Sequence, residues 1–357
     1  TSKVRAPTAA GVKVNLYKGG EEGEDDLIES HDMKSDDNGV WEVKVDGDLN
    51  GTYYTYTADF GDTQNEACDP YAKTVGVNGD RAMVIDMDST NPAGWDNDSN
   101  PNKNLKNTDV SIYELHVRDL SSDASSGIKN TGKYLGLTET GTTNSKGQST
   151  GLDHIKELGI THIQLNPVYD YATVDETKLD TNQFNWGYDP KNYNSPEGSY
   201  STDPYNGDVR VKEFKEMVKT LHDNDISVVM DVVYNHTYST DYCYNKLVPD
   251  YFYRPGSNGS GCGNDVASER AMVRNFIVDS VAYWAKEYHI DGFRFDLVGL
   301  IDVQTIKEIR AALDEIDPSI IIYGEGWSMT TTTTKEGTAL STQTNAVNLG
   351  NFGMFND

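Results

Sequence analysis

The chain has 357 residues, with 57 Asp and Glu against 30 Lys and Arg, which gives a formal charge of −27. A surface this acidic repels phosphate backbones and anionic lipid headgroups, and no basic cluster offsets it, so we expect no nucleic-acid partner. No apolar run approaches the roughly 18 residues that a membrane helix needs, so we expect no membrane partner. The substrate is expected to be neutral or cationic.

Residues 1–87 are predicted to form a small all-β sandwich domain. Short alternating stretches at 12–17, 41–45 and 53–56 are separated by clusters of Gly, Asn and Asp, a spacing of strands and turns that is typical of a sandwich. Residues 88–108 contain two prolines and many Asn and Asp residues without periodicity. We interpret them as a linker.

Residues 109–357 alternate compact apolar strands with amphipathic helices, which predicts an α/β fold with a parallel sheet, either a barrel or an open sheet. The predicted strands are 110–115, 161–165, 227–233, 292–297 and 320–323, and the predicted helices are 209–222, 269–288 and 302–316. No Gly-rich phosphate motif follows the first strand, which argues against dinucleotide binding. The threonine run at 330–334 is interpreted as a loop with no assigned chemistry.

The three cysteines, Cys68, Cys243 and Cys262, lie far apart and form no CxxC pair. Neither a zinc site nor a dense disulfide framework is therefore expected. Unpaired thiols are predicted, with a Cys243–Cys262 bridge as the alternative.

Polar side chains gather where the predicted strands end, at DVVYNH (231–236), GFRFD (292–296) and YGEGW (323–327). In a parallel barrel the reactive groups sit at these ends. Arg294 and Asp296 are two residues apart on a strand, so they point to the same side, where Arg294 is expected to keep Asp296 ionised. Asp296 and Glu325 would supply the two carboxylates that glycosidic cleavage needs. A structural Arg–Asp pair with an unrelated Glu is the alternative.

The loops around these strand ends are rich in aromatic residues, beginning with FNWGYDP at 184–190 and continuing through Tyr193, Tyr200, Tyr205, Tyr242, Tyr244, Tyr251, Phe252 and Tyr253. Sugar rings stack on flat aromatic faces, while their hydroxyls need polar partners, so the mixture favours a carbohydrate cleft. His236 is interpreted either as a ligand contact or as a hydrogen-bonded structural histidine.

At these motifs the sequence resembles glycoside hydrolase family 13, the α-amylase family, and within it the type I pullulanases, which cut α-1,6 branches. The strand-end motifs look like three conserved regions of that family. The resemblance implies that Asp296 is the nucleophile, that Glu325 is the general acid/base, and that Arg294 and His236 contact the sugar in the first subsite.

The segment 184–190 is similar to the pullulanase signature YNWGYDP, with Phe184 in place of Tyr. The resemblance implies that Tyr188 is a stacking platform beside the cleaved bond, and it favours debranching over plain amylase action. Trp186, Asp189 and Trp327 belong to the same motifs and are further candidate substrate-binding residues.

The resemblance extends to the N-terminal part, which looks like a family 48 starch-binding module, and it implies a (β/α)8-type barrel of which only about five β/α units are present. The family's third catalytic carboxylate, an Asp in a His-Asp pair at the seventh strand, is not found. The chain is therefore expected to be the N-terminal part of the barrel, a fragment that a C-terminal complementary chain would complete.

The implied function is retaining hydrolysis of α-1,6-glucosidic branch linkages in pullulan, amylopectin, glycogen or limit dextrins. The alternatives are a catalytically incomplete α-glucan-binding fragment, and an α-1,4-acting amylase or glucanotransferase. No cofactor is expected to be required; the acidic loops could hold calcium but show no ordered ligand spacing. The absence of a starting Met and the polymeric substrate favour an extracellular protein, while the cysteines leave the cytoplasm open.

Overall fold

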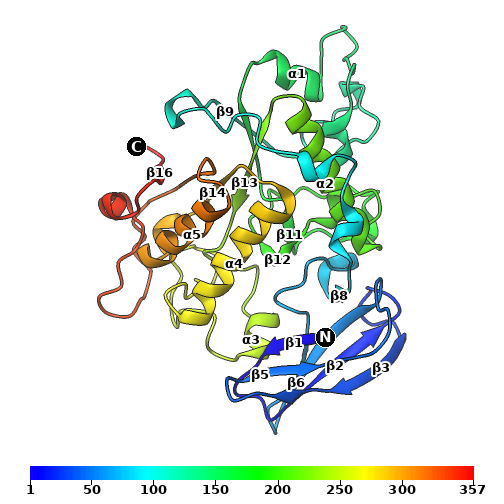
Figure 1. The fold of residues 1–357 in the computed structure, drawn as a ribbon, viewed down its shortest axis with the longest axis vertical. Helices are drawn as coiled ribbons and strands as arrows, with labels where there is room; N and C mark the ends of the chain where they lie inside the picture. Colours follow the sequence, from blue (N-terminus) through cyan, green and yellow to red (C-terminus); the bar gives the residue numbers. More distant parts are fainter.

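The computed structural model, which describes residues 1–357, begins with two antiparallel sheets (Figure 1). One contains β1 (Ser2–Arg5), β5 (Val40–Val43) and β4 (Lys34–Ser35); the other contains β3 (Leu27–Asp32), β2 (Gly11–Tyr17), β6 (Tyr53–Asp59) and β7 (Gln64–Ala67), with β8 (Ala82–Met83) paired to β6. Alternate residues of β2, such as Val12 and Val14, are buried between the sheets. The predicted sandwich is confirmed.

The second part is a six-stranded parallel sheet, which contains the five predicted strands and one further short strand. Its order is β16 (Gly353–Met354), β15 (Ile321–Gly324), β14 (Gly292–Phe295), β13 (Ser227–Val232), β10 (His162–Leu165) and β9 (Ile112–Leu115). The missed strand, β16, has two residues, too few to show an apolar period. The sheet is part of a (β/α)8-type barrel, as predicted, and β9 and β16 are its unpaired edges.

Helices cover this sheet, and a hairpin extends from it. The helices are α1 (Gly151–Glu157), α2 (Gly207–Asp223), α3 (Cys243–Leu247), α4 (Ala271–Tyr288) and α5 (Val303–Ile316), and the hairpin pairs β11 (Tyr169–Tyr171) with β12 (Pro190–Pro196). The helices α2, α4 and α5 lie within two residues of their predicted bounds. Asp302 begins α5, because its carboxylate accepts a hydrogen bond from the Thr305 N–H.

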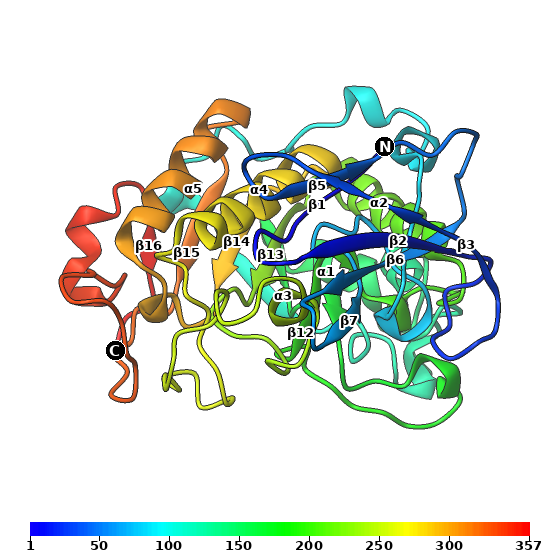
Figure 2. The same cartoon turned by 90° about the horizontal axis from the view of Figure 1, so that it is seen from below.

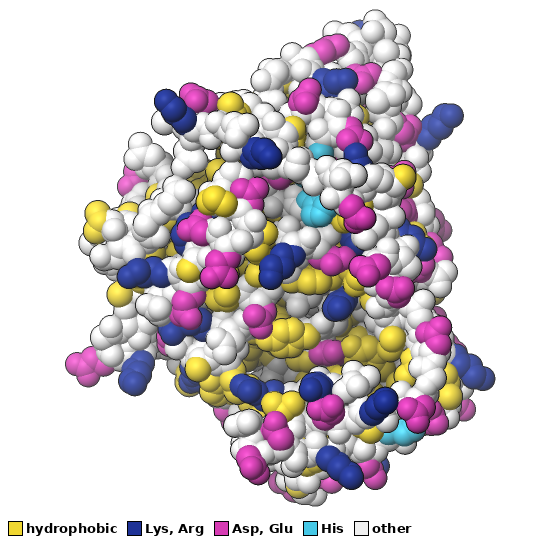
Figure 3. Space-filling view, viewed as in Figure 1, with side chains coloured by type: hydrophobic (Ala, Val, Ile, Leu, Met, Phe, Trp, Pro, Cys, Tyr) yellow, Lys and Arg dark blue, Asp and Glu magenta, His cyan; other side chains and the backbone are white.

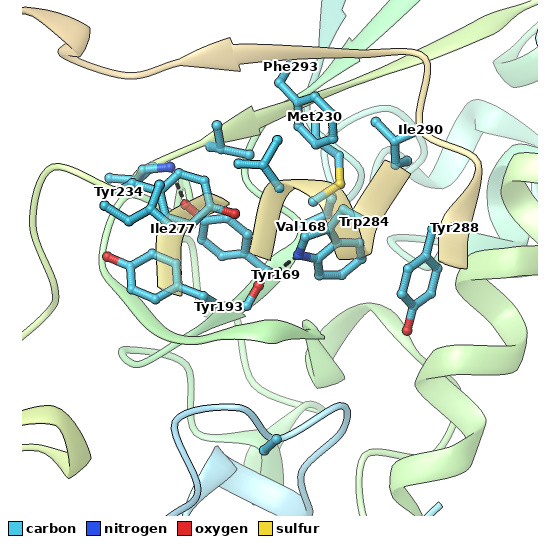
Figure 4. Packing of buried hydrophobic residues seen from close by; sticks show 14 of the residues in the cluster. Val168, Tyr169, Tyr193, Met230, Tyr234, Ile277, Trp284, Tyr288, Ile290 and Phe293 are labelled. Atoms are coloured by element: carbon cyan, nitrogen blue, oxygen red, sulfur yellow. Dashed lines mark hydrogen bonds between the residues drawn. The ribbon is translucent and has the colours of Figure 1, made fainter. Parts of the chain in front are cut away.

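The core of the α/β part lies between the sheet and α4 (Figure 4). Met230 of β13 and Phe293 of β14 are buried against Trp284, whose indole N–H donates to the Tyr193 carbonyl at 2.8 Å. β13 and β14 are buried along their whole length, as parallel strands covered on both faces must be. This packing holds the C-terminal ends of β13, β14 and β15 in place.

Residues 88–108, interpreted as a linker, contain only short helical turns, but they pack along α2 and α4. Trp95 stacks on His289 with ring centroids 3.9 Å apart. The buried Lys215 amino group donates to Thr90 Oγ1 at 2.8 Å and to Asn91 Oδ1 at 2.7 Å. These contacts attach the segment to the α/β part, while the domain boundaries 1–87 and 109–357 stay predictions.

The sandwich lies at one end of the α/β part, nearest α3 (Figure 1, Figure 2). Tyr53 of β6 donates to the Tyr205 carbonyl at 2.8 Å, and the Asn65 side chain donates to the Lys246 carbonyl at 3.1 Å. Apolar side chains gather in the hollow between the two parts (Figure 3), around a cavity of about 360 Å³. None of the predicted catalytic or substrate-binding residues lines this cavity, although three of the predicted cleft aromatics do, namely Tyr244, Tyr251 and Phe252.

All three cysteines are unpaired; Cys68 and Cys243 are buried and Cys262 is exposed. The alternative of a Cys243–Cys262 bridge is therefore wrong for this structure. No helix combines the length and the apolar character that crossing a bilayer requires.

Candidate active site

Asp296 and Glu325, the two predicted catalytic carboxylates, lie beside one guanidinium. Phe295 pairs with Gly324 in parallel register, so the residues that follow them leave the sheet side by side. Arg294 Nη1 lies 3.2 Å from Asp296 Oδ1, and Arg294 Nη2 lies 2.8 Å from Glu325 Oε1. The structure thus brings together three residues that the sequence places on two different strands.

A third carboxylate, Asp231, completes the group, and the sequence analysis did not select it. Asp231 pairs with Arg294 in the β13–β14 register, is fully buried, and accepts hydrogen bonds from Arg294 Nη1 at 2.8 Å and from the Tyr188 hydroxyl at 2.6 Å. The sequence nevertheless held a signal for Asp231, because a charged side chain within the apolar strand 227–233 needs a buried partner. The same argument had selected Arg294.

The group comprises one guanidinium and three carboxyl groups, so its acidic side chains outnumber its single cation. Burial raises the pKa of Asp231 to about 7, although Arg294 acts in the opposite direction. Burial also raises the pKa of Asp296, against the opposing effects of Arg294 and the Asn235 hydrogen bond. Arg294 thus opposes the desolvation of Asp296, and its role in keeping Asp296 ionised stays a prediction.

Asn235 and His236 hold the nucleophile candidate from the β13 side. The Asn235 amide donates to Asp296 Oδ2 at 2.8 Å and to the Asp296 carbonyl at 3.0 Å. The buried His236 ring has Nδ1 2.8 Å from Asn235 Oδ1 and Nε2 2.7 Å from the Tyr188 carbonyl. Both ring nitrogens thus have protein partners, and a sugar contact would use the ring face or a C–H edge. Asn235 is a second residue that the sequence analysis did not select.

The backbone between the two carboxylates is strained. Leu297, directly after Asp296, has φ 41°, a left-handed conformation that β-carbon sterics disfavour. Its N–H donates to Glu325 Oε2 at 3.0 Å. Each Glu325 oxygen therefore contacts one donor, either Arg294 of β14 or the Leu297 N–H in the turn that follows. These two contacts fix the plane of the carboxylate.

The signature loop 184–190 divides into exposed and bracing residues. Trp186 is 61% exposed, whereas Tyr188 is half-buried, with its hydroxyl on Asp231 and its ring 6.0 Å from the Arg294 guanidinium. Asp189 accepts hydrogen bonds from the Thr173 N–H at 2.8 Å and from the Asn185 amide at 2.9 Å. The Asp189 carboxylate therefore braces the loop, although it was predicted as a substrate contact.

Most other aromatic residues on these loops belong to the core. Trp327 is half-buried beyond Glu325, and Phe184 and Tyr205 are exposed. In contrast, the predicted cleft aromatics that the structure buries are Tyr193, Tyr200, Tyr242, Tyr244, Phe252 and Tyr253. Five of them form ring contacts with one another or with Phe276. Tyr200 instead packs against Tyr134 and Tyr171. Most of the residues that suggested an aromatic platform thus stabilise the loops from beneath.

The one cluster of carboxylates with metal-like spacing does not fit calcium. Asp170, Glu176 and Glu197 are buried and bring one oxygen each within 4.8 Å of one another. Arg210, also buried, lies 3.6 Å from Asp170 and 3.4 Å from Glu176, and both oxygens of Glu197 already accept backbone N–H groups. Calcium takes about six to eight oxygen ligands. Here the guanidinium supplies the positive charge.

Comparisons with known proteins agree with this geometry. Residues 56–250 match the family described as "Alpha amylase, catalytic domain", and residues 1–72 match carbohydrate-binding module 48, the isoamylase N-terminal domain. The pullulanase of Bacillus subtilis (strain 168) is 41% identical over 99% of this chain, and pullulanase 1 of Arabidopsis thaliana chloroplasts is 34% identical over 90%. The alignments cover 48% and 38% of those proteins, so the chain spans about half the length of its curated relatives or less.

Solved structures show the same relationship. The pullulanase from Paenibacillus barengoltzii, in complex with maltohexaose and α-cyclodextrin, superposes with a TM-score of 0.95 at 50% identity, covering 99% of this chain and 55% of that one. The pullulanase from Anoxybacillus sp. LM18-11 with maltotetraose has a TM-score of 0.91 at 43% identity, covering 99% and 51%. The fold of this chain is similar to theirs over nearly its whole length.

Proposed function

Because this chain belongs to the α-amylase family, we propose that it supplies the catalytic carboxylates of a glycoside hydrolase that cleaves α-1,6-glucosidic branch linkages. The main supporting observation is that Asp296 and Glu325, at neighbouring strand ends, both contact the guanidinium of Arg294. The pullulanases that the chain resembles, several solved with maltooligosaccharides, support a branched α-glucan such as pullulan, amylopectin, glycogen or a limit dextrin as substrate.

The proposed reaction is a double displacement with retention of configuration. Asp296 attacks the anomeric carbon while Glu325 gives its proton to the leaving glycosidic oxygen; the C–O bond breaks and a glycosyl–Asp296 ester forms. Glu325 then removes a proton from water, which attacks the ester and frees Asp296. To donate its proton to the glycosidic oxygen, Glu325 must rotate one carboxyl oxygen away from its present partner. These partners are Arg294 Nη2 at 2.8 Å and the Leu297 N–H at 3.0 Å.

Substrate contacts are assigned by position around this pair. Tyr188 lies beside Arg294 and is half-buried, so its ring face can stack on a sugar. Trp186, which is exposed, and Trp327, which is half-buried, are proposed as further stacking surfaces. Arg294 and His236 orient the nucleophile and the first subsite. Both reacting groups belong to the chain, so the proposal requires no cofactor.

The open edges of the sheet motivate a proposed partner. β9 and β16 end the strand order without pairing to each other, and an unpaired parallel edge exposes backbone N–H and C=O groups. We propose that further chain, covalently joined or separate, pairs with these edges and completes the barrel.

We also propose an extracellular site of action, because a polymeric glucan is encountered outside the cell.

The deciding experiment incubates the purified chain with pullulan and separates the products by chromatography. Release of maltotriose supports α-1,6 cleavage; trisaccharides that retain an α-1,6 bond would instead indicate α-1,4 hydrolysis, and longer products would indicate glucanotransfer. The Asp296→Asn variant is the control, expected to bind maltotriose and release no product. An Asn variant with full turnover would overturn the assignment of the nucleophile, and retention on immobilised amylopectin without any product would leave a glucan-binding role alone.

A further inference from the structure

The threonine run at 330–334, which follows the Glu325 strand end, is hydrogen-bonded to a loop from another part of the chain. We name residues 254–265 the Cys262 loop. Thr331 donates from its hydroxyl to the Asn258 carbonyl at 2.8 Å, and the Asn258 N–H returns a bond to the Thr331 carbonyl at 3.0 Å. One threonine thus holds the loop through both its side chain and its backbone.

Thr333 repeats this arrangement two residues later. Its hydroxyl donates to the Pro255 carbonyl at 2.8 Å, and its N–H donates to Ser257 Oγ at 2.9 Å. Alternate residues of an extended run point to the same side, which is why Thr331 and Thr333 share the role. Thr334 is exposed and makes no such bond.

The Cys262 loop is internally ordered by a buried carboxylate. Asp265 is fully buried and accepts hydrogen bonds from Ser257 Oγ at 2.5 Å, from the Gly259 N–H at 2.7 Å and from the Ser260 N–H at 2.9 Å. Gly259 packs so closely against Thr332 and Leu300 that a side chain there would collide. The loop is therefore held in one shape by its own hydrogen bonds, and its attachment points fix where it lies.

The base of the loop is attached to the catalytic segment. Asn264 accepts from the Thr237 N–H at 3.0 Å and donates to the Thr237 carbonyl at 2.9 Å, and the Val266 N–H donates to the Asn235 carbonyl at 2.9 Å. Asn235 in turn donates to Asp296. The loop therefore spans from the residues that hold the nucleophile to the segment after the general acid.

Cys262 lies on this span with its thiol exposed. Burial and then the negative charge of Asp296 raise the pKa of the Cys262 thiol, with Asp189 contributing in the same direction. The loop that carries Cys262 is attached at its base to Asn235, which donates to Asp296, and at Asn258 to the threonine run after Glu325.

We propose that Thr331 and Thr333 are positioning residues for glucan binding, which hold the Cys262 loop as one wall of the cleft so that Cys262 faces the bound glucan. This rests on the proposed function and adds to it a specificity-determining wall that comes from two separate chain segments.

The test uses the full chain and reads the Cys262 thiol. Cys68 and Cys243 are buried, so iodoacetamide in the folded state labels Cys262, which mass spectrometry of its peptide identifies. At a maltotriose concentration about ten times its Kd, the labelling rate of the unchanged chain should fall about tenfold, because only the free fraction reacts. Calorimetry gives the Kd independently.

Variants separate positioning from mere folding. In the chain carrying Thr331→Val and Thr333→Val, two neutral hydrogen bonds are lost, so the loop is held less firmly and most of the maltotriose protection should disappear. Thr334→Val is the matched control and should behave as the unchanged chain. Thr331→Ser with Thr333→Ser keeps both hydroxyls and should restore protection.

The outcomes are distinguishable. Maltotriose that binds by calorimetry without protecting Cys262 overturns the inference and leaves the proposed function standing. Full protection in the double valine variant overturns the role of the threonines. A chain that binds no maltotriose at all contradicts the proposed function, and the inference with it. If the double valine variant does not fold, the single Thr331→Val variant and the serine pair decide the question.

Discussion

Arg294 of β14 and Glu325, directly after β15, form an ion pair of 2.8 Å between neighbouring strands. The other terminal nitrogen of the same guanidinium lies 2.8 Å from Asp231 and 3.2 Å from Asp296. A guanidinium is planar and presents its donors at fixed spacing. Arg294 therefore sets the separation of the two carboxylates that the proposed reaction uses.

Arg294→Lys tests that geometry. Lysine keeps the charge but donates from a single nitrogen, so it cannot reproduce the fixed spacing of the two guanidinium nitrogens. Because misplacement of a reacting group by about 1 Å can cost about 100-fold in rate, we expect maltotriose release from pullulan to fall by about that factor. Initial rates and the midpoint of thermal unfolding are the measurements. Arg310→Lys on α5 is the control, and turnover near the unchanged level in Arg294→Lys would contradict the geometric role.

Tyr188 combines a ring beside Arg294 with a hydroxyl that donates to Asp231 at 2.6 Å. Tyr188→Ala removes the proposed stacking surface and should weaken maltotetraose binding about tenfold, whereas Tyr188→Phe keeps the ring and should retain most of the affinity. Calorimetry on the two variants separates the roles. Tyr205→Ala, an exposed aromatic at the sandwich interface, should leave affinity unchanged. Equal losses in the Phe and Ala variants would show that the hydroxyl matters and stacking does not.

Gly299 lies where the turn after β14 passes the strand end of β15. Its N–H donates to the Glu325 carbonyl at 3.1 Å, and a β-carbon there would collide with the Trp327 carbonyl oxygen. Backbone atoms cannot yield as a flexible side chain can, so Gly299→Ala should destabilise the fold by about 1–3 kcal/mol and displace Glu325 and Trp327.

Thermal unfolding and maltotetraose affinity check this. The matched control is Gly11→Ala in β2, where the nearest neighbour of an added β-carbon is 3.9 Å away. A Gly299→Ala chain as stable as the Gly11→Ala chain would show that the two strand ends are not in fixed contact.

His222 of α2 predicts a pH dependence of stability. Burial favours the neutral ring, but the carboxylates of Asp291 and Asp98, at 2.6 and 2.8 Å, outweigh it and raise the pKa of His222 to about 9. The ordinary value is 6.5, so the contribution is fully present below about pH 6.5 and is lost as the pH rises through about 9. Burial raises the pKa of Asp291 as well, which offsets part of the gain.

The measurement is the thermal midpoint of the unchanged chain minus that of His222→Gln, across this pH range. The difference should be largest at the acid end and smallest above about pH 9. His154→Gln on α1, a histidine without a carboxylate in ion-pair contact, is the matched control. A His222→Gln difference that grows toward high pH would contradict the assignment.

Local apolar periodicity predicted the longer helices and strands well. The period of Ile306, Ile309 and Leu313 placed α5, and all three side chains are buried as expected. β16 was missed because two residues carry no period. Residues 88–108 show no period either, yet Trp95 and Asp98 are held by His289 and His222 from distant helices. Packing of that kind leaves no local signature.

By itself the sequence determined the sandwich, the parallel α/β fold and the two carboxylates, because burial on regular elements imposes periods of two and 3.6 and because strand ends expose their polar residues at one edge. Tertiary structure alone decided that Asp231 shares Arg294 with Asp296, that most loop aromatics are core, and that a threonine run contacts a loop some 70 positions earlier. Those outcomes depend on register between strands and on desolvation, which are properties of the assembled fold and not of any one segment.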